Sequence, residues 1–341
     1  MKEEFNFEDI SPSLNTTHIK INLSFLEELL KDASKSALPH RDLNFSKKIG
    51  CTMNPSKKSA ITIYGWMKGY RTIPLSKITK IVELSKFSWR DIEKNLLTIK
   101  SGIRKGEVSP KFPIKMDYKL GSIAGHILGD GSIDKRFHSL FYSNSNPELL
   151  KEFSFFMEAI FGIPPRIWVQ DLPKYGETKW LKKAENLNEL PKGHNVGLFY
   201  PKICSDILCI LLGKFAEGKY KFITSQIKDA NLDFKKGFVR AFFDDEGSVS
   251  SKSYTIRLHQ DKKAILEDVI TILRELGINS NDIRSYEKRG KLRYYFNITS
   301  FEEYSYFYNK IGCTSSNKQR EFEILINKVK NSKYRRLKHS L

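Results

Sequence analysis

The sequence predicts an α+β protein in which an all-α domain precedes two copies of an α-β-β-α-β-β-α unit, related by a pseudo-twofold axis. Two observations support this class. Residues 21–100 place apolar side chains at helical spacing. Residues 113–341 contain two segments that match each other in order, each followed by alternating, strand-like stretches. The predicted domains are therefore residues 1–112, 113–230 and 231–341.

The composition is typical of a folded protein with a polyanionic partner. Of 341 residues, 40% are hydrophobic and 12% aromatic. A net charge of +19 favours nucleic acid or an anionic membrane surface, and charge alone does not choose between them. No apolar run reaches the roughly 20 residues that span a bilayer, and the acidic N-terminus lacks a signal-peptide core. We expect an intracellular, cytoplasmic protein, associated with the nucleoid if prokaryotic, with no membrane partner.

The predicted N-terminal domain consists of consecutive short helices. Leu23, Leu26, Leu29 and Leu30 have helical spacing, and Gly50 ends a second helix. Ser88 begins a helix predicted over 88–99, because Asp91 completes a capping-box pattern with it. The segment 106–120 contains two prolines and no periodicity, which indicates a domain boundary.

Two of these helices, joined around Gly50, form a helix-turn-helix pattern. Phe45-Ser46, Ile49-Gly50 and the run WMKGYR at 66–71 resemble the lambda-repressor-like helix-turn-helix family, although the insert at 51–62 is longer than the family's usual turn. The resemblance implies a DNA-facing surface near Lys57, Lys58, Thr62 and Tyr64, with Lys68 and Arg71 on phosphates. The alternative is a small helical bundle with solvated lysines.

The rest of the chain contains an internal repeat. GSIAGHILGDGSI at 121–133 matches GFVRAFFDDEGSV at 237–249, and both end in acid-Gly-Ser-aliphatic. Asp130 and Glu246 are 116 residues apart, and Leu150 precedes Leu266 by the same offset. Matches in order at a constant offset indicate a duplicated unit. Each copy then has strand-like stretches, an amphipathic helix (147–161; 262–276), further extended segments and a closing helix.

The two repeated segments resemble the LAGLIDADG family of homing endonucleases. Residues 123–131 and 239–247 fit its nine-residue pattern, with Asp130 and Glu246 at the eighth position, where the family has its catalytic acid. Leu128 replaces the usual first acid, which Asp244 retains in the second copy. The resemblance implies a Mg²⁺-dependent DNA endonuclease associated with intron mobility, a monomer that acts as a pseudo-dimer and cuts both strands of double-stranded DNA.

The residue types suit this chemistry. Small residues at Ala124, Gly125 and Ala241 let two helices approach closely, which would place Asp130 and Glu246 side by side. Two carboxylates at the negative ends of helix dipoles require a cation. Mg²⁺ prefers oxygen ligands and is typically held by one or two carboxylates, waters and substrate phosphates. We expect two or three ions there, with Gly129 and Asp245, which directly precede the acids, as further metal-ligating positions.

Basic and polar residues would complete the site. The family usually has a lysine before the last helix of each unit, which here implies catalytic roles for Lys221 and Lys318. Twisted sheets would form a saddle on the major groove. Its candidate DNA contacts are Lys135, Tyr142, Asn144, Arg257, His259, Gln260, Lys288, Arg289, Lys291 and Arg293. For each of them the alternative is an ordinary solvated strand face. His126, inside an apolar helix, is predicted to be a hydrogen-bonded core residue rather than a ligand.

Other functions fit the same fold. A catalytically silent DNA-binding regulator, or an RNA-splicing maturase with intron RNA as its partner, would use the same saddle. The two retained acids favour cleavage, because a protein that only binds DNA gains nothing from carboxylates facing phosphate. An intein is disfavoured, because the chain starts with Met and ends KHSL.

Overall fold

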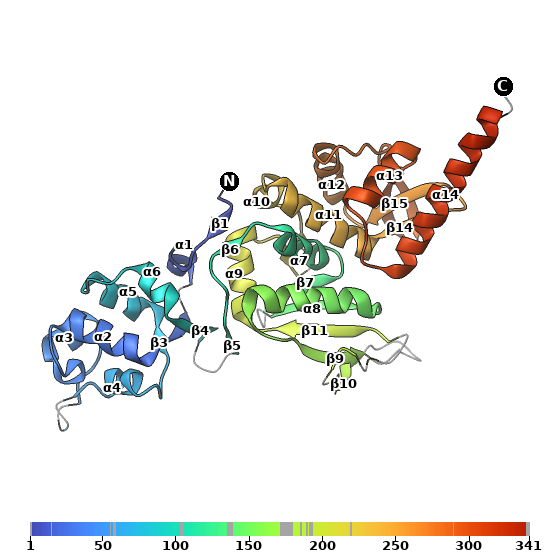
Figure 1. Cartoon of the computed structure of the whole chain (residues 1–341). Helices are drawn as coiled ribbons and strands as arrows, with labels where there is room; N and C mark the ends of the chain where they lie inside the picture. Colours follow the sequence, from blue (N-terminus) through green and yellow to red (C-terminus); the bar gives the residue numbers. More distant parts are fainter. Residues whose placement is uncertain are drawn as a thin grey trace.

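The fold is α+β, as predicted, with an N-terminal region followed by two units (Figure 1). The computed structural model describes residues 2–14, 16–54, 56, 59–102, 106–134, 139–170, 180–184, 186–188, 190, 194–218, 220–288 and 290–338. Of residues 180–183 and 332–338 it describes the backbone. Within these ranges no helix is both long and apolar enough to cross a membrane.

The helices of the N-terminal region agree with the predicted spacing. Leu26, Leu29 and Leu30 are buried on one face of α2, and the Ser88–Asp91 capping box is present. The helical elements are α1 (Phe7–Ile10), η1 (Ser11–Ser13), α2 (Leu23–Ser34), η2 (Pro39–Arg41), α3 (Leu43–Lys48), α4 (Ile61–Met67), α5 (Leu75–Glu83) and α6 (Trp89–Lys94). Gly50 follows α3 with a φ of 68°, which suits glycine at a helix end.

This region also contains strands, so the prediction of an all-α domain was wrong. A four-stranded antiparallel sheet has the order β3-β2-β4-β5, formed by β3 (Ile73–Pro74), β2 (Thr17–Ile21), β4 (Leu96–Ser101) and β5 (Glu107–Val108). The helix predicted over 88–99 ends at Lys94. From Leu96 the chain forms a strand that pairs with β2. Along this strand, the side chains from Thr98 to Ser101 alternate between partly exposed and buried positions, as is typical of a strand. A separate two-stranded ladder pairs β1 (Glu4–Phe5) with β6 (Ile114–Lys115).

The first unit surrounds a seven-stranded sheet. Its strands, in the order β10-β9-β11-β8-β7-β12-β13, are β10 (Trp180–Ala184), β9 (Arg166–Gln170), β11 (Val196–Tyr200), β8 (Leu140–Asn144), β7 (Gly131–Ile133), β12 (Ala216–Glu217) and β13 (Tyr220–Lys221). Its helices are α7 (Tyr118–Leu128), α8 (Pro147–Phe161), α9 (Lys202–Leu212) and α10 (Ser225–Lys228).

The second unit repeats the central part of this topology. Its sheet order β14-β15-β17-β16 corresponds to β7-β8-β11-β9. The strands are β14 (Gly247–Ser250), β15 (Thr255–Gln260), β17 (Lys291–Ile298) and β16 (Arg284–Lys288), and the helices are α11 (Leu232–Glu246), α12 (Lys263–Glu275), α13 (Phe301–Lys310) and α14 (Ser316–Lys338). The far end of α14 extends away from the body of the protein (Figure 1).

The two units meet along α7 and α11. A Cβ atom added to Gly121 would lie 2.0 Å from the carbonyl oxygen of Phe234, and one added to Gly237 would lie 2.1 Å from that of Tyr118. Gly121 and Gly237 are 116 residues apart, so the repeat supplies one glycine to each side of the contact. Further along, Gly125 lies against the Ala241 side chain, and Ala124 is fully buried. The backbones touch because both helices lack side chains here.

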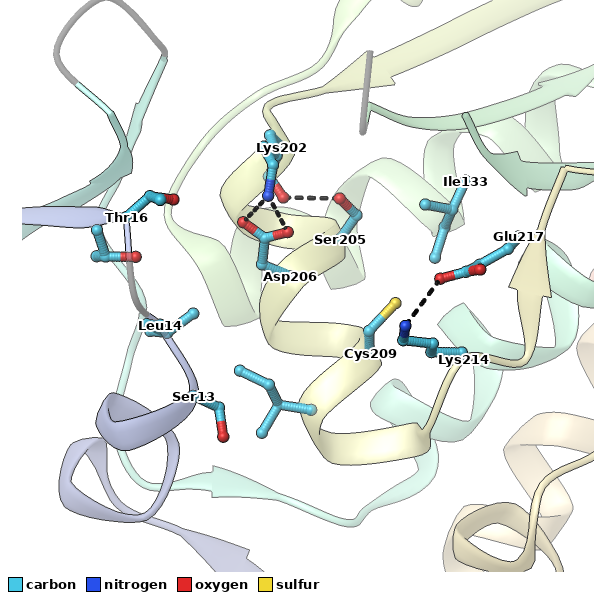
Figure 2. Close-up of a pocket in the computed structure, with 12 residues that line it drawn as sticks. Ser13, Leu14, Thr16, Ile133, Lys202, Ser205, Asp206, Cys209, Lys214 and Glu217 are labelled. Carbon is cyan, nitrogen blue, oxygen red and sulfur yellow. Dashed lines mark hydrogen bonds and ion pairs between the residues drawn. The ribbon is translucent and has the colours of Figure 1, made fainter. Parts of the chain in front are cut away.

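The N-terminal region packs against α9 of the first unit. The Ser101 hydroxyl of β4 donates to Asp206 over 2.7 Å, and a Cβ atom on Gly106 would lie 2.9 Å from the Pro201 ring. A cleft of about 280 Å³ lies between the two parts, lined by Ser13, Leu14 and Thr16 on one side and by α9 on the other (Figure 2). Lys202 and Asp206 form an ion pair at its rim. These contacts connect the two parts through side chains as well as through the chain itself.

Candidate active site

Asp130 and Glu246 lie at the adjacent ends of α7 and α11. Asp130 is exposed, yet surrounding protein atoms desolvate its carboxylate, and together with the charges of Asp245 and Glu246 this raises its pKa to about 7. The Glu246 side chain is 19% exposed. Burial, opposed by the charge of Lys221, raises the Glu246 pKa to about 6. The charge of Glu246 contributes to the raised pKa of Asp130, and the charge of Asp245 contributes to the raised pKa of both acids.

Each acid accepts a hydrogen bond from an amide at the end of its own unit's second strand. Asn144 Nδ2 donates to Asp130 Oδ2 over 2.9 Å, and Gln260 Nε2 donates to Glu246 Oε1 over 2.9 Å. Asn144 and Gln260 are also 116 residues apart. Both were predicted to contact DNA, which stays a prediction, and both are positioned to orient the acids. His259 Nε2 lies 4.0 Å from Glu246 Oε2.

The two predicted lysines bind the carbonyl groups at the ends of the motif helices. Lys221 Nζ donates to the Gly129 carbonyl, and Lys318 Nζ donates to those of Phe243 and Asp244 over 2.8 and 2.6 Å. A cation there is favoured by the helix dipole. Desolvation lowers the pKa of both lysines, although the nearby carboxylates oppose this effect. The structure thus brings together Asp130, Glu246, Lys221 and Lys318.

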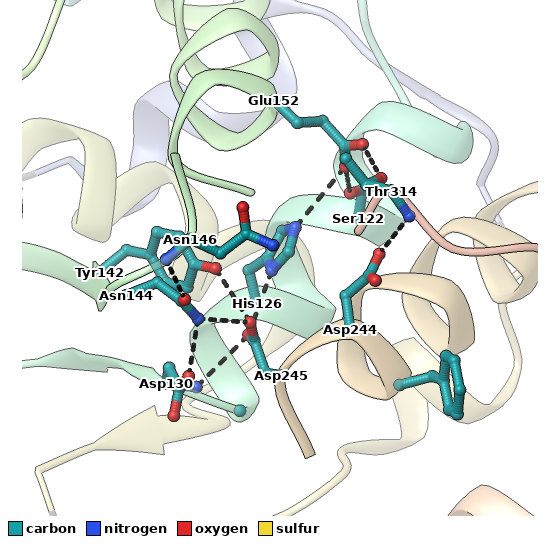
Figure 3. Close-up of polar contacts among 12 residues, drawn as sticks. Ser122, His126, Asp130, Tyr142, Asn144, Asn146, Glu152, Asp244, Asp245 and Thr314 are labelled. Atoms are coloured by element: carbon teal, nitrogen blue, oxygen red, sulfur yellow. Dashed lines mark hydrogen bonds and ion pairs between the residues drawn. The ribbon is translucent and has the colours of Figure 1, made fainter. Parts of the chain in front are cut away.

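Asp245 belongs to a buried cluster rather than to the open site (Figure 3). Its side chain is 0% exposed. Its carboxylate accepts hydrogen bonds from Tyr142 Oη at 2.9 Å and from Asn144 Nδ2 at 3.2 Å, and it lies 3.1 Å from His126 Nδ1. The prediction of Asp245 as a metal ligand was therefore wrong for its side chain, because its oxygens already bind protein donors away from solvent.

His126 lies between two carboxylates inside the protein. Its Nδ1 faces Asp245, and its Nε2 lies 3.5 Å from Glu152 Oε1. Burial alone would lower the pKa of His126, but the charges and hydrogen bonds of Asp245 and Glu152 raise it to about 9. It is a hydrogen-bonded core residue, as the sequence predicts.

A second buried group extends this cluster across the interface. Arg240 of α11 forms an ion pair with Glu152 of α8 and donates to the Ser122 hydroxyl over 2.8 Å. Against desolvation, His126 and Arg240 hold the Glu152 pKa at about 2. Asp244 accepts hydrogen bonds from the backbone N–H groups of Thr314 and Ser315. The polar side chains inside the motif helices therefore bond to one another between the units.

The other saddle candidates divide by exposure. Tyr142 is 0% exposed, so its prediction as a DNA contact was wrong: it lies on the face of β8 that points into the core. Lys288 and Lys291 are exposed. Arg257 is exposed and lies over the Tyr295 ring, whereas Arg293 forms an ion pair with Asp261 at 3.2 Å. Lys135 and Arg289 lie outside the described residues.

The helix-turn-helix candidates lie on or directly after α4. Tyr64 is 44% exposed, Lys68 and Arg71 are exposed, and Thr62 is half-buried. The ammonium group of Lys68 lies 5.9 Å from the Tyr64 ring centroid. Lys57 and Lys58 lie outside the described residues. Thr62, Tyr64, Lys68 and Arg71 are thus at least partly accessible.

The donor set fits a hard divalent cation that keeps water ligands. The described residues contain no group of three or more His, Cys, Asp and Glu side chains with metal-binding geometry. Mg²⁺ needs no such cage, because one or two carboxylates with waters and substrate phosphates usually hold it. Asp130 and Glu246 meet that description. The carbonyl of Gly129, the other predicted position, accepts a hydrogen bond from Lys221.

Sequence reasoning missed the roles of Asn144, Gln260 and Asp245. The constant offset could have found the first two, since Asn144 and Gln260 follow Asp130 and Glu246 by the same 14 residues. Strand alternation could have placed Tyr142 correctly, because it is two residues from the buried Leu140. The sequence held no signal that Asp245 would reach into the other unit.

The comparisons agree with the duplicated motif. The LAGLIDADG-like domain family matches residues 117–188 and 233–312, and the two matches include Asp130 and Glu246. Together the two matches cover 152 of the 341 residues, one in each repeated unit. Among curated proteins, the DNA-directed RNA polymerase subunit Rpo1C of Methanocaldococcus jannaschii is 24% identical over 222 residues. That match covers 64% of this chain and 22% of the length of the relative.

Similar solved structures include two homing endonucleases and a third protein. I-DmoI in complex with DNA and Mn is 16% identical, with a TM-score of 0.39, and the match covers 58% of this chain and 98% of that one. I-WcaI bound to its DNA recognition sequence is 16% identical, with a TM-score of 0.41, and the match covers 60% of this chain and 85% of that one. Full-length DUF199/WhiA from Thermatoga maritima is 15% identical, with a TM-score of 0.42, and the match covers 65% of this chain and 63% of that one.

Proposed function

We propose that this chain is a site-specific DNA endonuclease of the homing type, which cuts both strands of a duplex by metal-assisted hydrolysis of phosphodiesters. The observation that supports this most directly is the paired arrangement of Asp130 and Glu246. Each acid ends a motif helix, accepts an amide hydrogen bond, and lies near a lysine that binds that helix end. A protein that only bound DNA would be weakened by two carboxylates facing phosphate.

The residues divide the work of the reaction. Asp130 and Glu246 would hold Mg²⁺, which when bound activates water and stabilises the leaving oxygen. Asn144 and Gln260 orient the two carboxylates. Lys221 and Lys318 provide positive charge beside them, where it attracts the phosphate that is cut. Because both half-sites belong to one chain, we propose that a monomer makes the double-strand cut in the cytoplasm.

DNA would lie along the exposed strand faces. Arg257, Lys288 and Lys291 supply accessible positive charge on the second unit. We also propose that α3 and α4 act as a helix-turn-helix that contacts the duplex, with Tyr64, Lys68 and Arg71 on the accessible side. A combined Lys68→Ala and Arg71→Ala variant should weaken DNA binding and lower the slope of log affinity against log salt by about 2, since each lost phosphate contact lowers it by about 0.9. An unchanged slope would exclude this surface.

Cleavage is tested by selecting cut sites from a randomised DNA library with and without Mg²⁺. The wild type should cut a defined sequence only with the ion. Asp130→Asn and Glu246→Gln should each lose cutting while keeping their affinity for DNA. Binding without cutting by the wild type would support a DNA-binding regulator, and tighter binding to structured intron RNA than to DNA would support a maturase. A double variant that still cuts would exclude the assigned site.

A further inference from the structure

We propose that Asp245, although it belongs to the second motif, is a positioning residue for the half-site of Asp130, so that the two strands of DNA are cut by unequally supported acids. This inference rests on the proposed endonuclease function. It concerns the cluster of Asp245 with His126, Tyr142 and Asn144, in which Asn144 orients Asp130 and the other three have no role in the proposed reaction.

Among the described residues, the hydrogen-bond partners of Asp245 come from the first unit. His126 is on α7, and Tyr142 and Asn144 are on β8. The repeat makes the contrast plain, because the residues 116 positions later are Phe242, Leu258 and Gln260. Phe242 and Leu258 are apolar and fully buried. The second unit therefore keeps the amide that holds its acid, but it has apolar residues at the two positions equivalent to His126 and Tyr142.

A glycine makes room for this crossing. The residue that corresponds to Asp245 in the first motif is Gly129, 116 positions earlier. A Cβ atom on Gly129 would lie 2.7 Å from both the Cβ and the Oδ2 atom of Asp245. Any side chain there would displace Asp245 from its place. Gly129 of the first motif and Asp245 of the second thus form a complementary pair across the interface. The acid reaches from the second unit into the first, and the glycine of the first unit leaves space for it.

The cluster reaches Asp130 through an amide. Asn144 Nδ2 donates both to Asp245 Oδ1, at 3.2 Å, and to Asp130 Oδ2, at 2.9 Å. The backbone N–H of Asp130 also points toward Asp245 Oδ2, at 3.5 Å. Because Tyr142 and His126 are fully buried, the Asp245 carboxylate has little freedom to move. Together with the Asn146 backbone N–H, which donates to Asn144 Oδ1 over 2.9 Å, it holds the rotamer of Asn144, and Asn144 in turn orients the carboxylate of Asp130. Gln260, which orients Glu246, accepts the Asp261 backbone N–H over 2.8 Å, but the position equivalent to Asp245 is Gly129, which has no carboxylate.

The test separates the two strands. A duplex target recovered from the library, with a different fluorophore on each strand, is cut under single-turnover conditions, and the nicking rate of each strand is measured. Asp245→Asn keeps the size of the side chain but presents an N–H group toward His126 or Tyr142. We expect it to slow one strand about 10- to 100-fold more than the other, the loss typical of a residue that orients a metal-binding group, with unchanged DNA affinity. Tyr142→Phe, which removes a single donor, should slow the same strand less.

A second measurement does not depend on cutting. In metal-free protein labelled with ¹⁵N-asparagine, the side-chain amide resonance of Asn144 should shift in Asp245→Asn and in Tyr142→Phe. Asp268→Asn is the matched control, because it makes the same Asp-to-Asn change in the second unit. Asp268 lies 116 residues after Glu152, and the change removes only a surface ion pair with Lys228. It should leave both rates and the resonance unchanged. Equal slowing of both strands, or an unmoved Asn144 resonance, would overturn the inference alone. A wild type that cuts neither strand would overturn the proposed function as well.

Discussion

The close contact of α7 with α11 predicts a strong effect of one added methyl group. In Gly121→Ala the new Cβ would lie 2.0 Å from the Phe234 carbonyl oxygen, whereas ordinary contacts begin at 3.4 Å. The helices must therefore separate by roughly 1.4 Å at this point, the difference between the two distances. Alanine favours the helix by about 1 kcal/mol over glycine, but overpacking typically costs about 1–3 kcal/mol and the obstacle here is backbone. Because backbone cannot move aside as a side chain can, we expect the upper end of that cost, a net loss of about 2 kcal/mol after the gain in helix propensity is subtracted.

The same displacement should impair cutting more than stability. It moves Asp130 relative to Glu246, and a misplacement of about 1 Å can slow catalysis about a hundredfold. The assay pairs urea unfolding with single-turnover cleavage. Gly102→Ala is the control, because Gly102 has a φ of 78° and open space around it. That variant should lose about 1–2 kcal/mol through backbone strain while cutting at the wild-type rate. If Gly121→Ala unfolded and cut like the wild type, the close helix contact would be refuted.

Three further predictions concern the buried charges. Arg240→Met should lower the free energy of unfolding by about 3–5 kcal/mol, because it leaves the Glu152 carboxylate without its buried partner; a loss below about 1 kcal/mol in urea melts would contradict this. His126 has a folded-state pKa of about 9 against an ordinary 6.5, so its stabilisation is complete below pH 6.5 and is lost as the pH rises through 9. The free energy of unfolding should fall by about 3 kcal/mol over this range, as the difference between a pKa of about 9 and 6.5 implies. This fall should be absent from the pH profile of His126→Gln. Lys318→Met keeps the aliphatic stem but removes the donor to two carbonyls, and it should cost about 1–3 kcal/mol and slow cleavage; unchanged cutting would remove Lys318 from the site.

The duplicated part was predictable from three patterns in the sequence. The helical spacing of apolar residues, the alternation of the strand-like stretches and the constant 116-residue offset all indicated the same arrangement. Asp130 and Glu246 came together because each follows an apolar run with small residues at 116-residue spacing, and the sheets repeated as the alternating stretches predicted. The N-terminal sheet was not predictable in the same way. β4 has the length and apolar content of a helix end, and only its pairing with β2, far away in sequence, makes it a strand.

The site residues that the sequence did not predict correctly were also missed for a physical reason. The sequence shows which residue types are present but not which unit a side chain reaches. Asp245 follows Asp244 in the second motif, yet its bonds are with the first unit, because Gly129 leaves space on that side. Tyr142 was assigned to the wrong face of β8, although alternation from Leu140 contains the correct answer. Contacts across a pseudo-twofold interface depend on packing that no local pattern specifies.

The contacts between the N-terminal region and α9 hold the two parts in one relative position. Ser101 bonds to Asp206, and Gly106 packs against Pro201, so α4 keeps one separation and one rotation relative to Asp130 and Glu246. Duplex DNA repeats its face about every 10–10.5 base pairs. If both parts bind one duplex, a target lengthened by half a turn between their two footprints turns the second footprint to the opposite side, and a whole added turn restores its direction but not its distance. Under the proposed function, this fixed separation would make the spacing of the two footprints part of what the protein recognises.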